Sequence, residues 1–344
     1  MDATIFLFLM QDGVTNGAIY ALLGVALVLV FAVTRIIFIP QGEFVAYGAL
    51  TLAMLDVGRA PGTLGLLLAF GAAAFLMEMW EARADLSVAR VARIAAADLV
   101  LPAAIAAIVW VVAPMKPPPW ISLALTLAIV APMGPYLYVV AFRPLAEASV
   151  LTLLIVAVGV HLAMTGLGLA FFGAEGMRAR PLWDASFPAG PVVLTGQTLA
   201  VYGMAFAAMA ALSVFFSRTL YGKALSATAV NRLGARLVGV RAALSGSVAF
   251  TLAAVIGALS GALIAPMTTI YYDTGFLIGL KGFVAAIIGS LASYPVTAVA
   301  ALGVGAVEAL ASFYASEMKE VIVFTLVLPV LMWLSLAKPH AEEE

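Results

Sequence analysis

The sequence predicts an all-α polytopic membrane protein with about 9–11 transmembrane or half-spanning helices, one of them broken. Composition is the first reason, because 65% of the 344 residues are apolar and only 10% are charged. Soluble domains are closer to half apolar and a quarter charged. The mean hydropathy is +1.14, so no soluble fold could bury this much apolar surface. The second reason is that basic residues gather in short segments between the apolar runs, as in cytoplasmic loops of membrane proteins.

The same composition excludes several classes of function. A net charge of −1 favours neither nucleic acid nor another strongly charged partner. With no cysteine and two histidines, the chain offers no recognisable metal site or catalytic triad. Gly222-Lys223 is followed by Ala224, so the phosphate-binding loop of ATPases is missing. We therefore expect no catalytic residue, no bound metal and no cofactor in this chain, and the N-terminus does not resemble a cleaved signal peptide.

Apolar runs long enough to span or half-span a bilayer follow one another along the chain. They lie near residues 5–33, 42–56, 62–80, 98–113, 120–142, 149–172, 196–217, 243–266, 276–293, 296–314 and 320–336. The runs 42–56 and 276–293 are short and follow Pro or Gly residues, which is typical of half-helices that transporters break near a bound solute. We expect residues 1–338 to form one membrane domain and 339–344 to be a disordered tail.

The basic residues predict which ends of these spans face the cytoplasm. If all eleven segments cross, eleven basic residues fall on one side, five fall on the other and Lys281 lies within a segment. The richer side is expected to be cytoplasmic. This places the N-terminus outside and the C-terminus inside.

The most basic connection, residues 219–241, carries apolar side chains at a helical period, with Arg232 and Arg236 on the other face. It is either a short amphipathic helix on the cytoplasmic surface, able to pass force to the membrane helices, or a solvated loop that follows the charge rule. Three other connections have simpler expectations. Residues 83–97 form an interfacial helix, 114–119 a stiff external turn and 173–195 an external connector.

Polar side chains at membrane depth are costly and are therefore candidates for function. Asn16 and Tyr20 share one helix face, where they either line a path or pack helices together. Gln41, Glu43 and Tyr47 lie at the start of a short helix, whose unpaired N–H groups could bind a polar cargo group. Glu43 could equally stabilise that helix end by its charge alone.

Three further polar residues lie inside apolar runs. His161 is expected to be a packed, hydrogen-bonded side chain rather than a ligand. Lys281 and Glu308 are expected to pair across helices, because an unpaired charge there would be costly. A role for this pair in a transport path is the alternative.

Five stretches together resemble the permeases of branched-chain amino acid (hydrophobic amino acid uptake) ABC importers, and among these the first of the two permease types. They are Asn16 to Gly24, Ile36 to Gly48, Thr152 to Gly173, Tyr221 to Val240 and Gly279 to Leu310. The resemblance covers most of the chain, except a hydrophobic pair at about 62–118 that looks like an insertion. Two departures occur. Phe38-Ile39-Pro40 stands where the family usually has Asn-Phe-Ala, and Ser226-Ala227 where it repeats Arg-Ala.

The resemblance implies an importer subunit of the bacterial inner membrane that carries branched-chain or hydrophobic amino acids or related small acids. It implies four kinds of partner: a second homologous permease, two cytoplasmic ATPases that bind ATP and Mg²⁺, a periplasmic solute-binding protein and membrane lipid. Asn16, Tyr20, Gln41, Glu43 and Tyr47 would then line the path. Residues 219–241 would form the coupling loop, with Lys223, Asn231, Arg232 and Arg236 at the ATPase. An ion-coupled secondary transporter is the alternative, followed by a membrane enzyme or a structural subunit.

Overall fold

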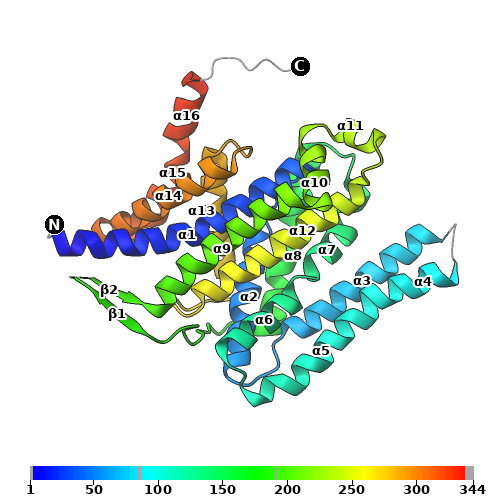
Figure 1. Cartoon of the computed structure of the whole chain (residues 1–344), viewed down its shortest axis with the longest axis horizontal. Helices are drawn as coiled ribbons and strands as arrows, with labels where there is room; N and C mark the ends of the chain where they lie inside the picture. The colour runs from blue at the N-terminus through cyan, green and yellow to red at the C-terminus, as the bar shows by residue number, and fades with distance from the viewer. Residues whose placement is uncertain (1–2, 84–86, 191, 338–344) are drawn as a thin grey trace.

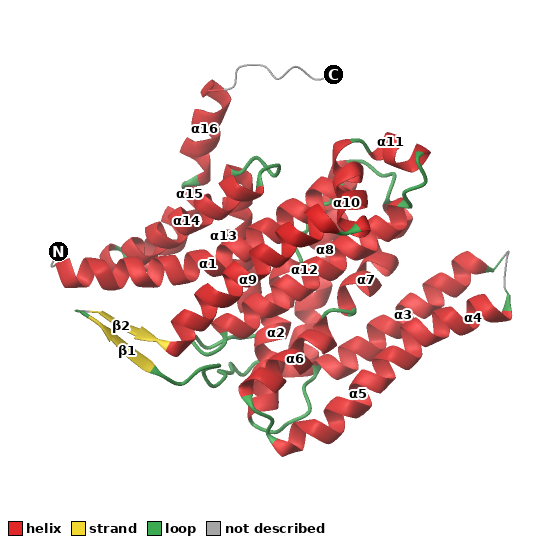
Figure 2. Cartoon of the chain, in the orientation of Figure 1, coloured by secondary structure: helices red, strands yellow, loops and turns green. Residues whose placement is uncertain are grey.

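The computed structural model describes residues 3–83, 87–190 and 192–337, and most of them are helical (Figure 2). This confirms the expected all-α class. The predicted disordered tail, residues 339–344, lies outside the described residues. A small β-hairpin is the exception to the helical architecture, and it protrudes from one end of the bundle (Figure 1).

The long helices are α1 (Ala3–Thr34), α3 (Thr63–Ala82), α8 (Val150–Phe172), α9 (Gly196–Arg218), α12 (Ala242–Ile264) and α14 (Tyr294–Tyr314). Shorter helices are α2 (Gln41–Asp56), α4 (Val88–Ala95), α5 (Leu101–Val112), α6 (Pro119–Val130), α7 (Met133–Leu137), α10 (Leu220–Val230), α11 (Arg232–Leu237), α13 (Thr274–Ile288), α15 (Lys319–Thr325) and α16 (Val327–Ala337). Single turns of π-helix lie at Ala96–Val100 and Tyr138–Phe142, and 3₁₀ turns at Ala113–Met115, Arg143–Leu145 and Ser316–Met318. The hairpin strands are β1 (Ser186–Ala189) and β2 (Val192–Thr195), paired antiparallel.

Within the described residues, eight helical stretches are long and apolar enough to cross a bilayer. The short helices α2 and α13 are additional, with 16 and 15 residues, so they can cross only part of the 30 Å hydrocarbon layer. The run expected at 320–336 is divided at Leu326 into α15 and α16. Long, half-length and broken helices are thus all present in one bundle.

Helix α1 forms the centre of this bundle and packs along α12, α13 and α14 (Figure 1). Most of its apolar length is buried in protein, whereas α8 and α9 turn most of their side chains outward. The approach of α1 to α14 depends on glycine, because a Cβ atom at Gly305 would lie 2.2 Å from the carbonyl oxygen of Gly13. Small residues allow such close contacts between membrane helices, where dispersion forces rather than water exclusion hold the helices together.

Helices α3, α4 and α5 form an arm beside the main bundle (Figure 1). The separate interfacial helix expected at 83–97 is not what the structure shows. Instead, α4 continues through the π turn at Ala96–Val100 into α5, giving one 28-residue span, Val88–Met115. The span does not break there because Asp98 faces protein rather than lipid, and its backbone carbonyl lies against Gly71 of α3. The predicted stiff turn at 114–119 is partly helical, since the 3₁₀ turn Ala113–Met115 includes its first residues and α6 begins at Pro119.

The two ends of the bundle differ in charge. At the hairpin end, Gln11 of α1 donates a hydrogen bond to Val193 of β2, and Asp56 at the end of α2 bonds Arg180. The opposite end of the bundle contains α10 and α11, which follow α9 in the chain (Figure 1). It is called the basic end here. Helix α2 begins inside the bundle and ends at the hairpin end, so it covers only part of the distance between the two ends.

Candidate functional site

Helices α2 and α13 begin inside the bundle, and their first turns touch. A Cβ atom at Gly42 would lie 2.3 Å from the carbonyl oxygen of Gly275, and one at Gly275 would lie 2.1 Å from that of Gly42. Only glycine permits backbones to approach this closely. From this contact α2 runs to the hairpin end and α13 runs the other way. The contact of the two helix starts is called the junction below.

Two polar side chains of α2 are fixed beside the junction. Gln41 and Glu43 are each only 1% exposed. The Gln41 Nε2 amide donates to the backbone oxygen of Ala253 on α12 at 3.0 Å. Gln41 Oε1 and Glu43 Oε2 are buried and have no hydrogen-bond partner among the described residues. Since buried polar atoms are nearly always paired, these two acceptors mark a place where a donor could bind.

The other carboxylate oxygen of Glu43 is engaged by His161 of α8. The distance from His161 Nδ1 to Glu43 Oε1 is 2.6 Å. The ring of His161 stacks on Phe276 of α13, with centroids 4.3 Å apart. Three helices, α2, α8 and α13, therefore meet through one carboxylate, one imidazole and one phenyl ring.

The sequence predicted a hydrogen-bonded His161 but did not identify its partner. Glu43 lies 118 positions earlier, and no spacing rule connects residues on separate membrane helices. The only available signal was that both are ionisable groups at membrane depth. Tyr47, one turn beyond Glu43, donates its hydroxyl to the backbone oxygen of Met164 at 2.6 Å, so it too joins α2 to α8.

A second buried cluster contains the expected pair of Lys281 and Glu308. Lys281 Nζ lies 2.5 Å from Glu308 Oε1 and 3.1 Å from Glu320 Oε1. Tyr20 donates its hydroxyl to Glu308 Oε2 at 2.6 Å. The Lys281 ammonium group thus ties α13 to α14 and α15, and the Glu308 carboxylate adds α1 through Tyr20. Asn16 lies half-buried one turn before Tyr20 on α1.

The five residues expected to line a path therefore divide between two places. Gln41, Glu43 and Tyr47 surround the junction, whereas Tyr20 belongs to the ion cluster and Asn16 lies close to it along α1. The hydroxyl contact of Tyr20 supports helix packing, the alternative that the sequence left open.

The basic end carries the residues expected to meet a cytoplasmic partner. The segment expected to form one amphipathic helix is divided into two short helices, α10 and α11. Asn231 Oδ1 accepts a hydrogen bond from the Gly234 backbone N–H at 2.8 Å and so caps α11. Arg236 pairs with Glu147 near the start of α8, while Lys223 is exposed and Arg232 half-buried.

Apolar side chains are also exposed along these two helices. Leu233 is 69% exposed and Leu237 81% exposed. Val230 and Val238 beside them are exposed to a similar degree. An exposed apolar patch rimmed by positive charge is typical of a surface that another protein covers.

Comparisons with known proteins give a consistent result. The sequence model of a family described as the permease component of the branched-chain amino acid transport system matches residues 85–332. The high-affinity branched-chain amino acid transport system permease proteins LivH of Salmonella typhimurium and Escherichia coli are each 28% identical to this chain over 214 residues. The corresponding protein BraD of Pseudomonas aeruginosa is 28% identical over 218 residues. Each alignment covers 59% of this chain and 70% of the relative.

Among solved structures, PsaBC from Streptococcus pneumoniae in complex with Fab aligns with 96% of this chain and 91% of its own. The TM-score is 0.39 and the sequence identity is 11%, which is too low to carry any argument about this chain.

Proposed function

Because the chain belongs to the family of permease components of branched-chain amino acid transport systems, we propose that it forms half of an inward path for hydrophobic amino acids. Related small organic acids fall within the same proposal. The chain is a multi-pass membrane protein and a permease subunit of an ABC transport system. We place it in the bacterial inner membrane, with its basic end in the cytoplasm.

The proposal assigns the energy source and the delivery of cargo to partners. Two cytoplasmic ATPases would bind ATP and Mg²⁺, since this chain has no phosphate-binding loop. A second, homologous permease would complete the path, and a periplasmic solute-binding protein would deliver cargo at the hairpin end.

The observation that carries the proposal is the junction of α2 and α13. Helix N-termini carry a partial positive charge, and transporters use broken helices to present it to the carboxylate of a solute. Beside these helix starts lie the unpaired acceptors of Gln41 and Glu43, which suit an ammonium group. The arrangement thus offers opposite charges to the two ends of a zwitterion. We propose that Gln41, Glu43 and Tyr47 line the path and that His161 holds Glu43 when no cargo is bound.

The junction is closed in this structure, because Gly42 and Gly275 are in backbone contact. Cargo passage therefore requires α2 and α13 to separate. We propose that the ATPases drive this separation through α10 and α11, with Lys223, Asn231, Arg232 and Arg236 at the contact. The exposed apolar side chains of α10 and α11 support this assignment.

Reconstitution tests the transport class. Proteoliposomes that contain both permeases should accumulate labelled leucine only when the ATPases, ATP and the binding protein are all present. Uptake by this chain alone under an H⁺ or Na⁺ gradient would overturn the proposal in favour of a secondary transporter.

Charge reversal tests the coupling surface. Arg232→Glu with Arg236→Glu should abolish co-purification of the ATPases and uptake, because both side chains lie on the proposed contact. Arg59→Glu with Lys116→Glu, at the hairpin end, makes the same change in net charge and should leave ATPase association intact. Equal association of both variants with the ATPases would contradict the coupling assignment.

Conservative substitutions test the path. Glu43→Gln and His161→Gln should each lower the rate of leucine uptake about tenfold or more, which corresponds to roughly 1.4 kcal/mol. Asp98→Asn is the matched control, because Asp98 is also a buried carboxylate but lies in the arm formed by α3 to α5. Normal uptake by Glu43→Gln would remove Glu43 from the path.

A further inference from the structure

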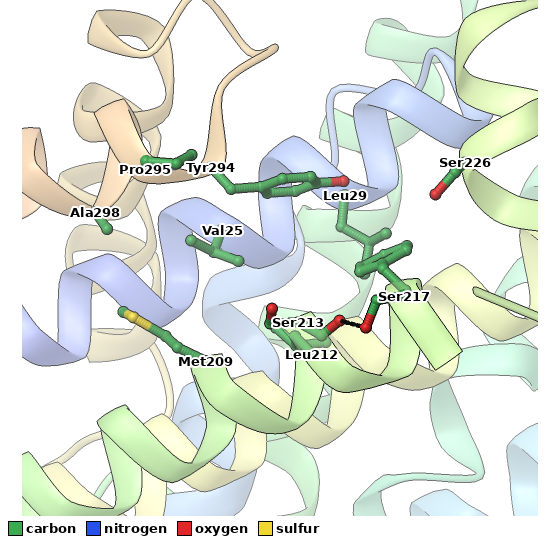
Figure 3. A pocket seen from close by; sticks show the side chains of 11 residues that line it. Val25, Leu29, Met209, Leu212, Ser213, Ser217, Ser226, Tyr294, Pro295 and Ala298 are labelled. Carbon is green, nitrogen blue, oxygen red and sulfur yellow. Dashed lines mark hydrogen bonds between the residues drawn. The ribbon is translucent and has the colours of Figure 1, made fainter. Parts of the chain in front are cut away.

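A cavity of about 560 Å³ opens between α1, α9 and α14, beside α10 (Figure 3). Its inner wall is apolar and includes Val25 and Leu29 of α1 and Met209 and Leu212 of α9. The volume lies in the range of small-molecule sites. None of the residues of the junction lines this cavity, so it is a separate feature, called the groove below.

The lining of the groove becomes polar towards the basic end. Ser213 and Ser217 of α9 and Ser226 of α10 contribute hydroxyl groups there. Ser217 Oγ donates to the backbone oxygen of Ser213 at 2.8 Å. Tyr294 at the start of α14 stacks on Phe216, with ring centroids 5.9 Å apart. A rim of hydroxyl groups therefore borders an apolar interior.

Two positive charges follow this rim. Arg218 comes directly after Ser217 and is the last residue of α9, and Lys223 lies one turn before Ser226 on α10. Residues three apart share a helix face, so Lys223 is on the side of α10 that carries Ser226. Both basic side chains are exposed, and neither forms an ion pair with another residue in the described part of the chain.

We propose that the groove binds one anionic phospholipid from the leaflet at the basic end. The order of surfaces along the groove, from apolar wall to hydroxyl rim to cations, matches the order of acyl chain, ester region and phosphate in such a lipid. Apolar cavities in protein stay dry and accept apolar molecules, and in a bilayer the surrounding apolar molecules are acyl chains. Basic pockets between helices on the cytoplasmic side are suited to anionic headgroups.

The bound lipid would connect α14 with α9 and α10, which already pack against each other. Its acyl chain would fill the space between α9 and α14, and its headgroup would contact α10. Because α10 belongs to the proposed coupling surface, the lipid would hold this helix against the membrane helices. The inference requires only that the chain lies in a bilayer, so it does not depend on which cargo is carried.

Native mass spectrometry of the detergent-purified full chain, without the ATPases that Lys223 is proposed to contact, tests the headgroup when phosphatidylglycerol or phosphatidylcholine of identical acyl chains is added. The wild type should retain phosphatidylglycerol more tightly. Arg218→Gln with Lys223→Gln should weaken the binding of phosphatidylglycerol about 25-fold, because the loss of each charge should lower the affinity about fivefold. Arg59→Gln with Lys116→Gln, two exposed cations at the hairpin end, should change the affinity less than twofold. Equal loss in both double variants, or equal wild-type affinity for the two lipids, would overturn the proposal.

A second pair of variants tests the acyl-chain part. Ala298→Phe fills the groove from α14 and should remove the tightly bound lipid. Val299→Phe places the same aromatic side chain on the neighbouring residue, which is 70% exposed and does not line the groove, and should retain the lipid. Ala298→Cys, in a chain without other cysteines, should not form cross-links with the second permease. Cross-linking there would show that the groove has a protein occupant, and lipid retention by Ala298→Phe would show that the lipid binds elsewhere. Either result would overturn the proposal.

Discussion

Replacing Lys281 by methionine tests the energetics of the buried ion cluster. Methionine keeps an unbranched chain of similar length but removes the ammonium group that contacts Glu308 at 2.5 Å and Glu320 at 3.1 Å. Lys281 and Glu308 are only 5% and 6% exposed. After the substitution Glu308 keeps the hydrogen bond from Tyr20 but has lost its counter-charge.

The expected loss of stability is large because Glu308 stays buried after Lys281 is removed. Removing one member of a buried ion pair typically destabilises a protein by about 3–5 kcal/mol. The remaining Tyr20 bond to a charged acceptor contributes only about 1.5–3 kcal/mol, so it does not offset the loss of the counter-charge. The double variant Lys281→Met with Glu308→Gln removes both buried charges and keeps an acceptor for Tyr20. The side chain of Glu320 is 32% exposed, so it stays partly solvated without Lys281. We expect the stability of the double variant to lie within about 1 kcal/mol of the wild type.

Equilibrium unfolding in detergent micelles, followed by circular dichroism, measures these differences. Lys116→Met is the control, because this lysine is exposed at the hairpin end, and its cost should stay below about 0.5 kcal/mol. A loss of less than about 1 kcal/mol for Lys281→Met would refute the reasoning, since the charge would then be solvated rather than buried. The same conclusion would follow if the double variant were no more stable than the single one.

Two further predictions concern helix packing and surface charge. Gly305→Ala should destabilise the chain by about 1–3 kcal/mol, because the new methyl group would meet the backbone of Gly13 at 2.2 Å. In contrast, Gly303→Ala has no atom within 4 Å of the new methyl group and should be neutral or slightly stabilising, and equal effects would contradict the packing argument. At the basic end, the hydrogen bond from Arg236 lowers the pKa of Glu147, so this pair persists at neutral pH and is lost as the pH falls through that lowered pKa. Arg236→Gln should therefore return the pKa of Glu147 towards its ordinary value in an infrared titration, and an unchanged pKa would show that the pair does not form in solution.

The sequence was sufficient to locate the long spans because their apolar runs are unambiguous. The run predicted at 149–172 is α8, with bounds that differ by one residue. The run predicted at 276–293 ends earlier, at Ile288, because Ser290 and Leu291 adopt positive φ angles, which hydropathy does not reveal. The division at Leu326 has a local cause that the sequence does contain. Pro329 lacks the N–H that would bond the carbonyl of residue 325, and its ring crowds that carbonyl.

The candidate site was only partly predictable, and the reason is that it joins distant segments. The short length of 42–56 and of 276–293 indicated half-helices, but nothing in the sequence showed that their starts would meet at Gly42 and Gly275. The pairing of Lys281 with Glu308 was predicted only from the free-energy cost of an unpaired buried charge, since two opposite charges in apolar runs have few other partners. Glu320 was expected at the beginning of a span and instead became the third member of this cluster.

Helix α13 links the two polar clusters of the membrane interior. Phe276 in its first turn stacks on His161, and Lys281, five residues later, binds Glu308. Residues five apart on a helix point to different faces, so α13 separates the two clusters. A change in the depth or tilt of α13 must therefore disturb the contact at the junction and the buried ion pair together. In the proposed transport cycle, opening of the junction weakens the ion pair of Lys281 and Glu308. The electrostatic free energy lost in this way favours return of α13 to the closed position.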